Sequence, residues 1–106
     1  MRPMTGLGII VAGSDRDRFR TALNLAAAQA ALGGRVRLLL DGDSVRLAAG
    51  QDALLEACLD LGATVTLCQS GLAAAGLDAR KLDPRLDYGG MVGWLTELGE
   101  DRLVIA

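Results

Sequence analysis

The stretch LGIIVA, Leu7–Ala12, is apolar at every position and is rich in β-branched side chains. A strand that is covered on one face alternates between apolar and polar residues, whereas a strand that is buried on both faces has no polar position. Strands of the second kind lie in parallel sheets with helices on either side. The stretch ends at Gly13, and we predict that it forms a central strand of such a sheet, covered on both faces.

A long helix is expected to follow this strand, over residues Asp15–Leu32. Ser14 or Asp15 can accept hydrogen bonds from the first free amides of the helix. Asp17 lies in the first turn, where the helix dipole favours a carboxylate. The pair Gly33-Gly34 is typical of a helix end.

Two apolar stripes run along this predicted helix. The first consists of Phe19, Leu23, Ala26 and Ala30, and the second consists of Leu25, Ala28 and Leu32. One stripe is enough to pack a helix against a sheet, so the second stripe would lie in water in a single chain. We therefore expect the second stripe to contact another copy of the chain.

The remainder of the chain continues to alternate between strand and helix signals. We expect further strands over 35–40, 64–68 and 102–106, and helices over 45–49, 52–61, 71–75 and 90–98. The strand over 35–40 is expected nearer the sheet edge, and the last strand is expected to be buried. Residues 78–88 are polar and show no periodicity, which predicts a surface loop. Ser70 is the expected cap of the helix over 71–75.

This alternation predicts the fold class. Strands separated by helices form an α/β fold with right-handed crossovers, in which helices cover both faces of the sheet. A chain of 106 residues suits a single domain over 1–106. We therefore predict a flavodoxin- or Rossmann-like, three-layer α/β/α domain with a mostly parallel sheet of about four to five strands.

Composition and charge exclude several classes of partner. The net charge is −2, and the 11 Lys and Arg residues are interleaved with the 13 Asp and Glu residues. Nucleic acid and anionic membranes are bound by gathered basic patches, so we expect neither as a partner. The two cysteines show no repeated spacing, which indicates a reducing, cytoplasmic compartment rather than a disulfide framework.

The chain contains no histidine. Its absence excludes a Ser-His or Cys-His pair and removes the most common metal ligand. The sequence Asp41-Gly42-Asp43 could ligate a hard cation, but an EF-hand loop would have Asp or Asn in place of Val45 and Gly in place of Arg46. We interpret this stretch as a turn, and we expect neither a metal nor a cofactor.

Ligands of open parallel sheets gather outside the carboxyl ends of the strands. Three turns of this sequence are expected at that edge: Gly13-Ser14-Asp15, Asp41–Ser44 and Cys68-Gln69-Ser70. Their polar side chains and free amides could line one shared site. The candidate ligand-binding residues are Ser14, Asp41, Gly42, Asp43, Gln69, Ser70 and Gly71.

Cys68 is the candidate nucleophile. A thiolate next to the amides of a helix N-terminus is stabilised, and it is then available near neutral pH. The alternative is that Cys68 is a small core residue, as free cysteines frequently are. Cys58 shares a helix face with Leu54 and Leu61, and this spacing predicts a core position for Cys58.

The sequence resembles the DsrE/DsrF-like family, which includes the Tus proteins of sulfur relays. The resemblance covers nearly the whole chain and rests on the segments AALGGRVRLLLDGDSV, LGATVTLCQSGLAAAGL and GWLTELGEDRLVIA. It implies a small α/β/α domain that assembles as a homotrimer or hexamer. It also implies that a cysteine after the third main strand, here Cys68, carries sulfur as a persulfide. Relay members commonly have basic residues where this chain has Ala74 and Ala75.

Three functional hypotheses follow. The first is a sulfurtransferase-like persulfide carrier that accepts sulfane sulfur on Cys68 and passes it to an acceptor thiol. Its partners would be sulfur-donor and acceptor proteins or small thiols. The second is a non-catalytic oligomeric module that binds a small molecule or a protein and in which Cys68 only packs. The third is thiol redox sensing or weak peroxidase activity.

Overall fold

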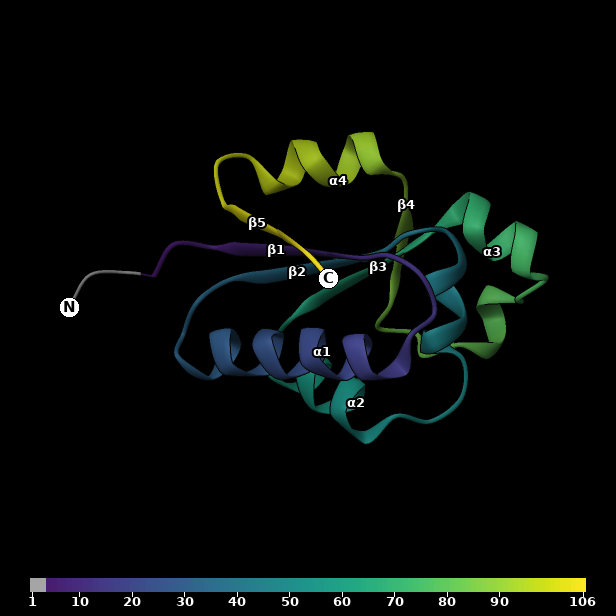
Figure 1. Cartoon of the computed structure of the whole chain (residues 1–106), viewed down its shortest axis with the longest axis horizontal. Helices are drawn as coiled ribbons and strands as arrows, with labels where there is room; N and C mark the ends of the chain where they lie inside the picture. The colour runs from purple at the N-terminus through teal and green to yellow at the C-terminus, as the bar shows by residue number, and fades with distance from the viewer. Residues whose placement is uncertain (1–3) are drawn as a thin grey trace.

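A five-stranded, entirely parallel sheet forms the middle of the molecule in this computed structural model, which describes residues 4–106 (Figure 1). The strands are β1 (Leu7–Val11), β2 (Val36–Leu40), β3 (Thr64–Cys68), β4 (Asp87–Gly89) and β5 (Arg102–Ile105). They lie in the order β4-β3-β2-β1-β5. The α/β fold predicted from the sequence is confirmed.

Helices lie on both faces of the sheet and beyond its carboxyl end (Figure 1). They are α1 (Arg16–Ala31), the 3₁₀ helix η1 (Gly42–Ala48), α2 (Ala53–Asp60), α3 (Gln69–Ala75), the 3₁₀ helix η2 (Ala79–Lys81) and α4 (Met91–Leu98). α1 and α2 cover one face, and α4 covers part of the other (Figure 1). α3 packs beside η1 at the carboxyl ends of the strands. The predicted three layers are therefore present.

The helix α1 begins where the sequence indicated. Asp15 is its N-cap, and one carboxylate oxygen of Asp15 accepts hydrogen bonds from the amides of Asp17 and Arg18, at 2.8 and 3.1 Å. Phe19 and Leu23 of the predicted inner stripe are buried in the core between α1 and the sheet. The apolar stripe thus fixes which side of α1 faces the sheet.

β1 is buried along its whole length, as predicted for a strand that is covered on both faces. Ile9 belongs to the large core beneath α1 and α2. Ile10 points to the opposite face, where it joins a smaller cluster of Leu39, Trp94 and Leu98 beneath α4. Because successive side chains of a strand point to opposite faces, β1 contributes residues to the core beneath α1 and α2 and to the cluster beneath α4.

Gly8 allows α4 to approach the sheet closely. A Cβ atom at this position would collide with the Leu98 side chain and would lie 2.9 Å from Cη2 of Trp94. Trp94 and Leu98, which pack α4 against the sheet, thus occupy the space that a side chain at Gly8 would fill. A glycine inside a strand commonly marks such a close approach.

Two strands occupy positions that differ from the prediction. β2 lies in the centre of the sheet rather than nearer an edge, since Leu38–Leu40 are fully buried and Arg37 pairs with Glu97 of α4 at 3.0 Å. β5 forms an edge, and its four residues are exposed in the single chain instead of buried. An apolar run is typical of both kinds of strand, so strand order was needed to distinguish them.

The predicted loop over 78–88 contains regular structure. The carboxylate of Asp78 accepts a hydrogen bond from the amide of Arg80 at 3.0 Å, and this contact caps η2. β4 then adds an edge strand beside β3, with Asp87 paired to Thr66. A strand of three residues is too short to show a periodic pattern, which is why the sequence indicated a loop.

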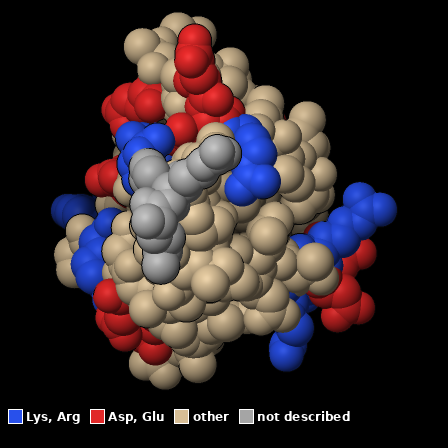
Figure 2. Space-filling view, turned by 90° about the vertical axis from the view of Figure 1, so that its left-hand side faces the viewer, with Lys and Arg blue, Asp and Glu red and all other residues tan. Residues whose placement is uncertain are grey.

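The surface carries charges of both signs. On the face shown in Figure 2, acidic and basic side chains lie among one another rather than in separate areas. This distribution agrees with the interleaved charges of the sequence. Within residues 4–106, no helix is both long enough and apolar enough to cross a membrane.

We expect Gly8→Ala to lower the free energy of unfolding by about 1–3 kcal/mol, because the added methyl group forces Trp94 and Leu98 away from the sheet. Gly93→Ala in α4 is the matched control. Its Cβ would meet nothing within 4 Å, so it should stabilise the helix by about 0.5–1 kcal/mol. Urea unfolding measures both changes. A Gly8→Ala variant as stable as the unaltered protein would contradict the packing described for α4.

Candidate functional site

Cys68 is the residue at which β3 ends and α3 begins. Its backbone is extended, and its Sγ accepts a hydrogen bond from the amide of Gly71 at 3.4 Å. Cys68 is therefore the N-cap of α3, and the prediction that Ser70 fills this role is wrong. α3 begins earlier than expected, at Gln69, so Ser70 lies inside its first turn.

The Cys68 thiol is surrounded by groups that favour its anion. Its Sγ lies 3.2 Å from Oγ of Ser70, and the hydroxyl can donate to the thiolate. The hydrogen bond from Ser70 is the main cause that lowers the pKa of Cys68, followed by backbone contacts with Gly42 and Gly71. Partial burial and the carboxylate of Asp41 oppose the shift but do not reverse it. The thiol is partly exposed and can be reached by a reactant.

A close contact between two glycines positions this thiol. A Cβ atom on Gly71 would lie 2.5 Å from the carbonyl oxygen of Gly42. Gly42 has a φ of +56°, which is a conformation that side chains disfavour. Glycine at both positions lets the start of η1 approach the start of α3. The residues after β2 and β3 thereby lie next to each other, whereas the third predicted turn, Gly13-Ser14-Asp15, contributes no residue to the hollow beside them.

A hollow of about 440 Å³ opens beside Ser70. We call it the thiol hollow, and its walls consist of Gly42, Asp43, Arg46, Ser70, Gly71, Ala74 and Ala75. Cys68 is not one of the walls, but its Sγ lies 3.2 Å from Oγ of the wall residue Ser70. Asp43 and Arg46 form an exposed ion pair of 2.7 Å across one turn of η1. The sequence analysis did not select Arg46. Its spacing of three residues from Asp43 in a helical segment was the available signal.

Three predicted site residues, Ser14, Asp41 and Gln69, do not line the thiol hollow. Ser14 is exposed in the connection that follows β1, and β1 is separated from β3 by β2. Gln69 is exposed as the first residue of α3 and does not line the hollow. Gly42, Asp43, Ser70 and Gly71 are the predicted residues that line it. Asp41 acts on the thiol only as a nearby charge.

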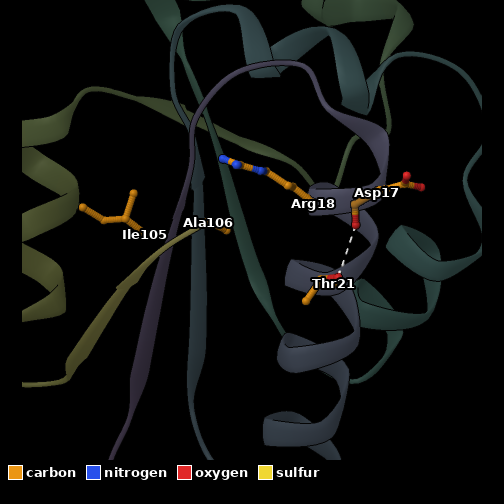
Figure 3. A pocket seen from close by; sticks show the side chains of 5 residues that line it. All are labelled: Asp17, Arg18, Thr21, Ile105 and Ala106. Carbon is orange, nitrogen blue, oxygen red and sulfur yellow. Dashed lines mark hydrogen bonds between the residues drawn. The ribbon is translucent and has the colours of Figure 1, made fainter.

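A second hollow, of about 390 Å³, lies beside the edge strand β5, between α1 and the end of β5 (Figure 3). In Figure 3, the side chain of Arg18 extends toward Ala106, whereas Ile105 points to the other side of β5. The hydroxyl of Thr21 donates to the backbone carbonyl of Asp17 at 3.3 Å. Unlike Ser70 and Gly71 of the thiol hollow, none of these five residues is hydrogen-bonded to Cys58 or Cys68, so this hollow is not the candidate site.

Cys58 lies in the core, as its position on α2 predicted. It is fully buried, and its Sγ donates to the carbonyl oxygen of Leu23 at 3.2 Å. Burial raises the pKa of Cys58, and the negative charge of Asp52 raises it further. Leu61, which the spacing placed on the same inner face, is instead exposed as the C-cap of α2. Both cysteines are free thiols.

Three solved structures resemble this fold. The YchN protein of E. coli matches with a TM-score of 0.83 and 21% identity, over 97% of this chain and 100% of that chain. BT1422 of Bacteroides thetaiotaomicron, a conserved protein of unknown function, matches with a TM-score of 0.78 and 21% identity over 96% and 95%. MTH1491 of Methanobacterium thermoautotrophicum, also of unknown function, matches with a TM-score of 0.77 and 16% identity over 97% and 100%.

These structural matches concern the fold alone, because their sequence identities are low. No protein-family profile and no curated protein sequence matches this chain. The fold nevertheless agrees with the small α/β/α domain that the sequence resemblance implied. The comparisons therefore support the predicted arrangement of helices and strands, and the chemistry must be argued from the side chains.

We expect iodoacetamide to alkylate Cys68 with an apparent pKa below about 8.5, the value for a free thiol, and to leave Cys58 unmodified in the folded protein. Ser70→Ala should raise the apparent pKa of Cys68, because the hydrogen bond of Ser70 favours the thiolate. Alkylation rates measured against pH by peptide mass spectrometry separate the two cysteines.

Ser14→Ala is the matched control for this titration, because Ser14 lies apart from the thiol hollow. It should leave the titration of Cys68 unchanged. A Cys68 thiol that titrates at or above the value of a free thiol would contradict the electrostatic description of the site.

Proposed function

We propose that this chain is a persulfide carrier and that Cys68 is the residue that holds the transferred sulfur. The observation that carries the proposal is the hydrogen bonding of Sγ by Ser70 and Gly71 at the start of α3. A thiol with a lowered pKa and partial exposure has the properties of a nucleophile rather than of a packing residue. The resemblance to DsrE-like proteins supports the same role, and we propose membership of that family.

The transfer consists of two thiol exchange steps. The Cys68 thiolate attacks the outer sulfur of a donor persulfide, which forms a Cys68 persulfide and releases the donor as a thiolate. An acceptor thiolate then attacks the outer sulfur of that persulfide. The new bond forms on the acceptor, and the Cys68 thiolate leaves. The cycle needs no external oxidant or reductant, because the sulfane sulfur carries its oxidation state from donor to acceptor.

The surroundings of Cys68 suit both steps. The thiolate is the attacking group in the first step and the leaving group in the second, so hydrogen bonds to the anion favour each of them. The thiol hollow beside Ser70 offers space for the end of a donor or acceptor. Sulfur-donor and acceptor proteins or small thiols are the proposed partners, and the reducing cytoplasm is the proposed compartment.

A sulfane donor tests the carrier function. We expect polysulfide to add about 32 Da, one sulfur atom, to the peptide that contains Cys68, and we expect glutathione to remove it. Cys68→Ser should abolish the adduct, whereas Cys58→Ala should retain it, because Cys58 is buried. Ser70→Ala should slow its formation at neutral pH. An adduct that persists in Cys68→Ser, as measured by mass spectrometry, would defeat the assignment.

We also propose that the chain functions as a homo-oligomer. The outer stripe of α1 is exposed in the single chain, with Leu32 at 71% of its accessible surface. A second apolar area lies on α4 and on the edge strand β5, where Val92 is 83% exposed and Ile105 is 70% exposed. Exposed edge strands and apolar helix faces are commonly covered by another subunit. The sequence analysis did not select the α4 and β5 area.

Light scattering coupled to size exclusion tests this assembly. We expect a mass greater than that of one chain at micromolar concentration. Val92→Glu should shift the protein toward the monomer, because it places a charge in the apolar area of α4. Leu32→Glu tests the α1 stripe separately, and Gln51→Glu, on the exposed connection before α2, is a control for added charge. A monomeric unaltered protein would refute the proposal.

A further inference from the structure

The two edges of the sheet differ in how they are protected. β4, at one edge, is only three residues long and begins with the exposed charge of Asp87. Short length and exposed charge both discourage another strand from pairing with an edge. β5, at the other edge, is apolar over 103–105, and no charged residue or proline follows Arg102 in this strand. β5 is therefore the edge that is open to pairing.

The free backbone groups of β5 are arranged symmetrically. The amides of Arg102 and Ala106 donate to carbonyl oxygens on the β1 side of the strand. The backbone groups of successive strand residues point to alternate sides, so those of Val104 also face β1, and those of Leu103 and Ile105 face outward. On that side, β5 has no neighbouring strand within residues 4–106. The outward donors and acceptors thus lie symmetrically about Val104.

Apolar side chains border this edge on both faces of the sheet. Ile105 is paired with Ile10 of β1, which belongs to the cluster beneath α4. Leu103 and Ile105 therefore point to the face that carries α4, whereas Val104 points to the face that carries α1. All three side chains are exposed in the single chain. A neighbour at the edge would bury apolar surface on both faces.

Exposed apolar residues of α4 and α1 lie beside the same edge. Gly93 and Glu97 of α4 line a hollow of about 420 Å³ next to β3 and β4, so the exposed Leu95, on the other side of the helix, faces the β5 side. On α1, Arg18 lines the hollow next to the end of β5 (Figure 3). Leu25 follows Arg18 by two turns, on the same side of α1. The two exposed apolar areas thus border one edge of the sheet.

We propose that β5 pairs in antiparallel fashion with β5 of a second copy of this chain, about a two-fold axis at Val104. Leu103 of each copy lies opposite Ile105 of the other, and every outward amide and carbonyl of these two residues then has a partner. Arg102 lies opposite Ala106, so no like charges face each other. A second copy is the occupant because the free groups of β5 match the same groups of an identical strand that runs in reverse.

This contact rests on the proposed homo-oligomer and names the strand that forms it. It also determines where the two thiols lie. β2 and β1 separate β3 from β5, so Cys68 lies away from the paired edge in each copy. Each thiol hollow therefore remains open in the pair, and the persulfide carrier function does not depend on the contact.

A disulfide trap tests the pairing. Val104→Cys in a Cys68→Ser background should oxidise to a covalent dimer, because Cα atoms of a non-hydrogen-bonded antiparallel pair lie about 4.5 Å apart, within the range of a disulfide. Cys58 is fully buried and does not compete. Gln51→Cys, on the exposed connection before α2, is the matched control and should remain a single chain on a non-reducing gel. An assembled protein whose Val104→Cys variant gives no covalent dimer would overturn the pairing and leave the homo-oligomer standing.

Single cysteines on either side of the axis test the register. Leu103→Cys alone lies opposite Ile105, so it should give little covalent dimer. A mixture of Leu103→Cys and Ile105→Cys proteins should link, because the Cα atoms of such a hydrogen-bonded pair lie about 5.5 Å apart. A dimer from Leu103→Cys alone, with none from Val104→Cys, would overturn the axis at Val104.

A lysine at the edge tests the contact without a cross-link. Val104→Lys places like charges opposite each other at the axis, and it should lower the mass measured by light scattering about twofold. Gln51→Lys adds the same charge elsewhere and should retain the mass. Both variants should still take up sulfur from polysulfide on Cys68, which lies at the end of β3. An unchanged mass in Val104→Lys would refute the pairing, whereas failure of the unaltered protein to take up sulfur would refute only the carrier function.

Discussion

The close approach of Gly71 to the carbonyl oxygen of Gly42 is the contact on which the candidate site depends. It draws the first turn of α3 against the start of η1, although the two segments follow different strands. The Cys68 thiol is thereby held between a capping amide, the Ser70 hydroxyl and the backbone of Gly42. A side chain at Gly71 would separate these groups, so the chemistry of the thiol rests on backbone packing.

The two cysteines show how the surroundings determine the properties of a thiol. Cys58 lies in the core, where loss of water raises its pKa. Cys68 lies at the carboxyl end of β3, where hydrogen bonds favour the thiolate and lower the pKa of Cys68. The same side chain is therefore an inert core residue in one place and a candidate nucleophile in the other. Under the proposed function, this difference directs the sulfur chemistry to Cys68 and away from Cys58.

The two faces of the sheet are covered unequally, and this asymmetry shapes the surface of the molecule. α1 and α2 cover one face, whereas α4 alone lies on the other (Figure 1). Trp94 and Leu98 bury the part of that face near β1 and β2, in a cluster with Ile10 and Leu39. The part beside β3 and β4 is left with a hollow of about 420 Å³ next to Trp94, and the outer side of α4 and the edge strand β5 carry exposed apolar side chains.

The sequence by itself determined β1, α1 and the turn that carries Cys68, because apolar runs, helix caps and periodicity depend on neighbouring residues. The order of the strands in the sheet decided which strands are central and which turns lie close together. It placed β2 in the centre and β5 at an edge, and it separated Ser14 from the thiol, which short-range patterns do not encode. The contact of Cys68 with Gly42 also depended on the tertiary structure, since it joins segments that are distant in the sequence and that pack together.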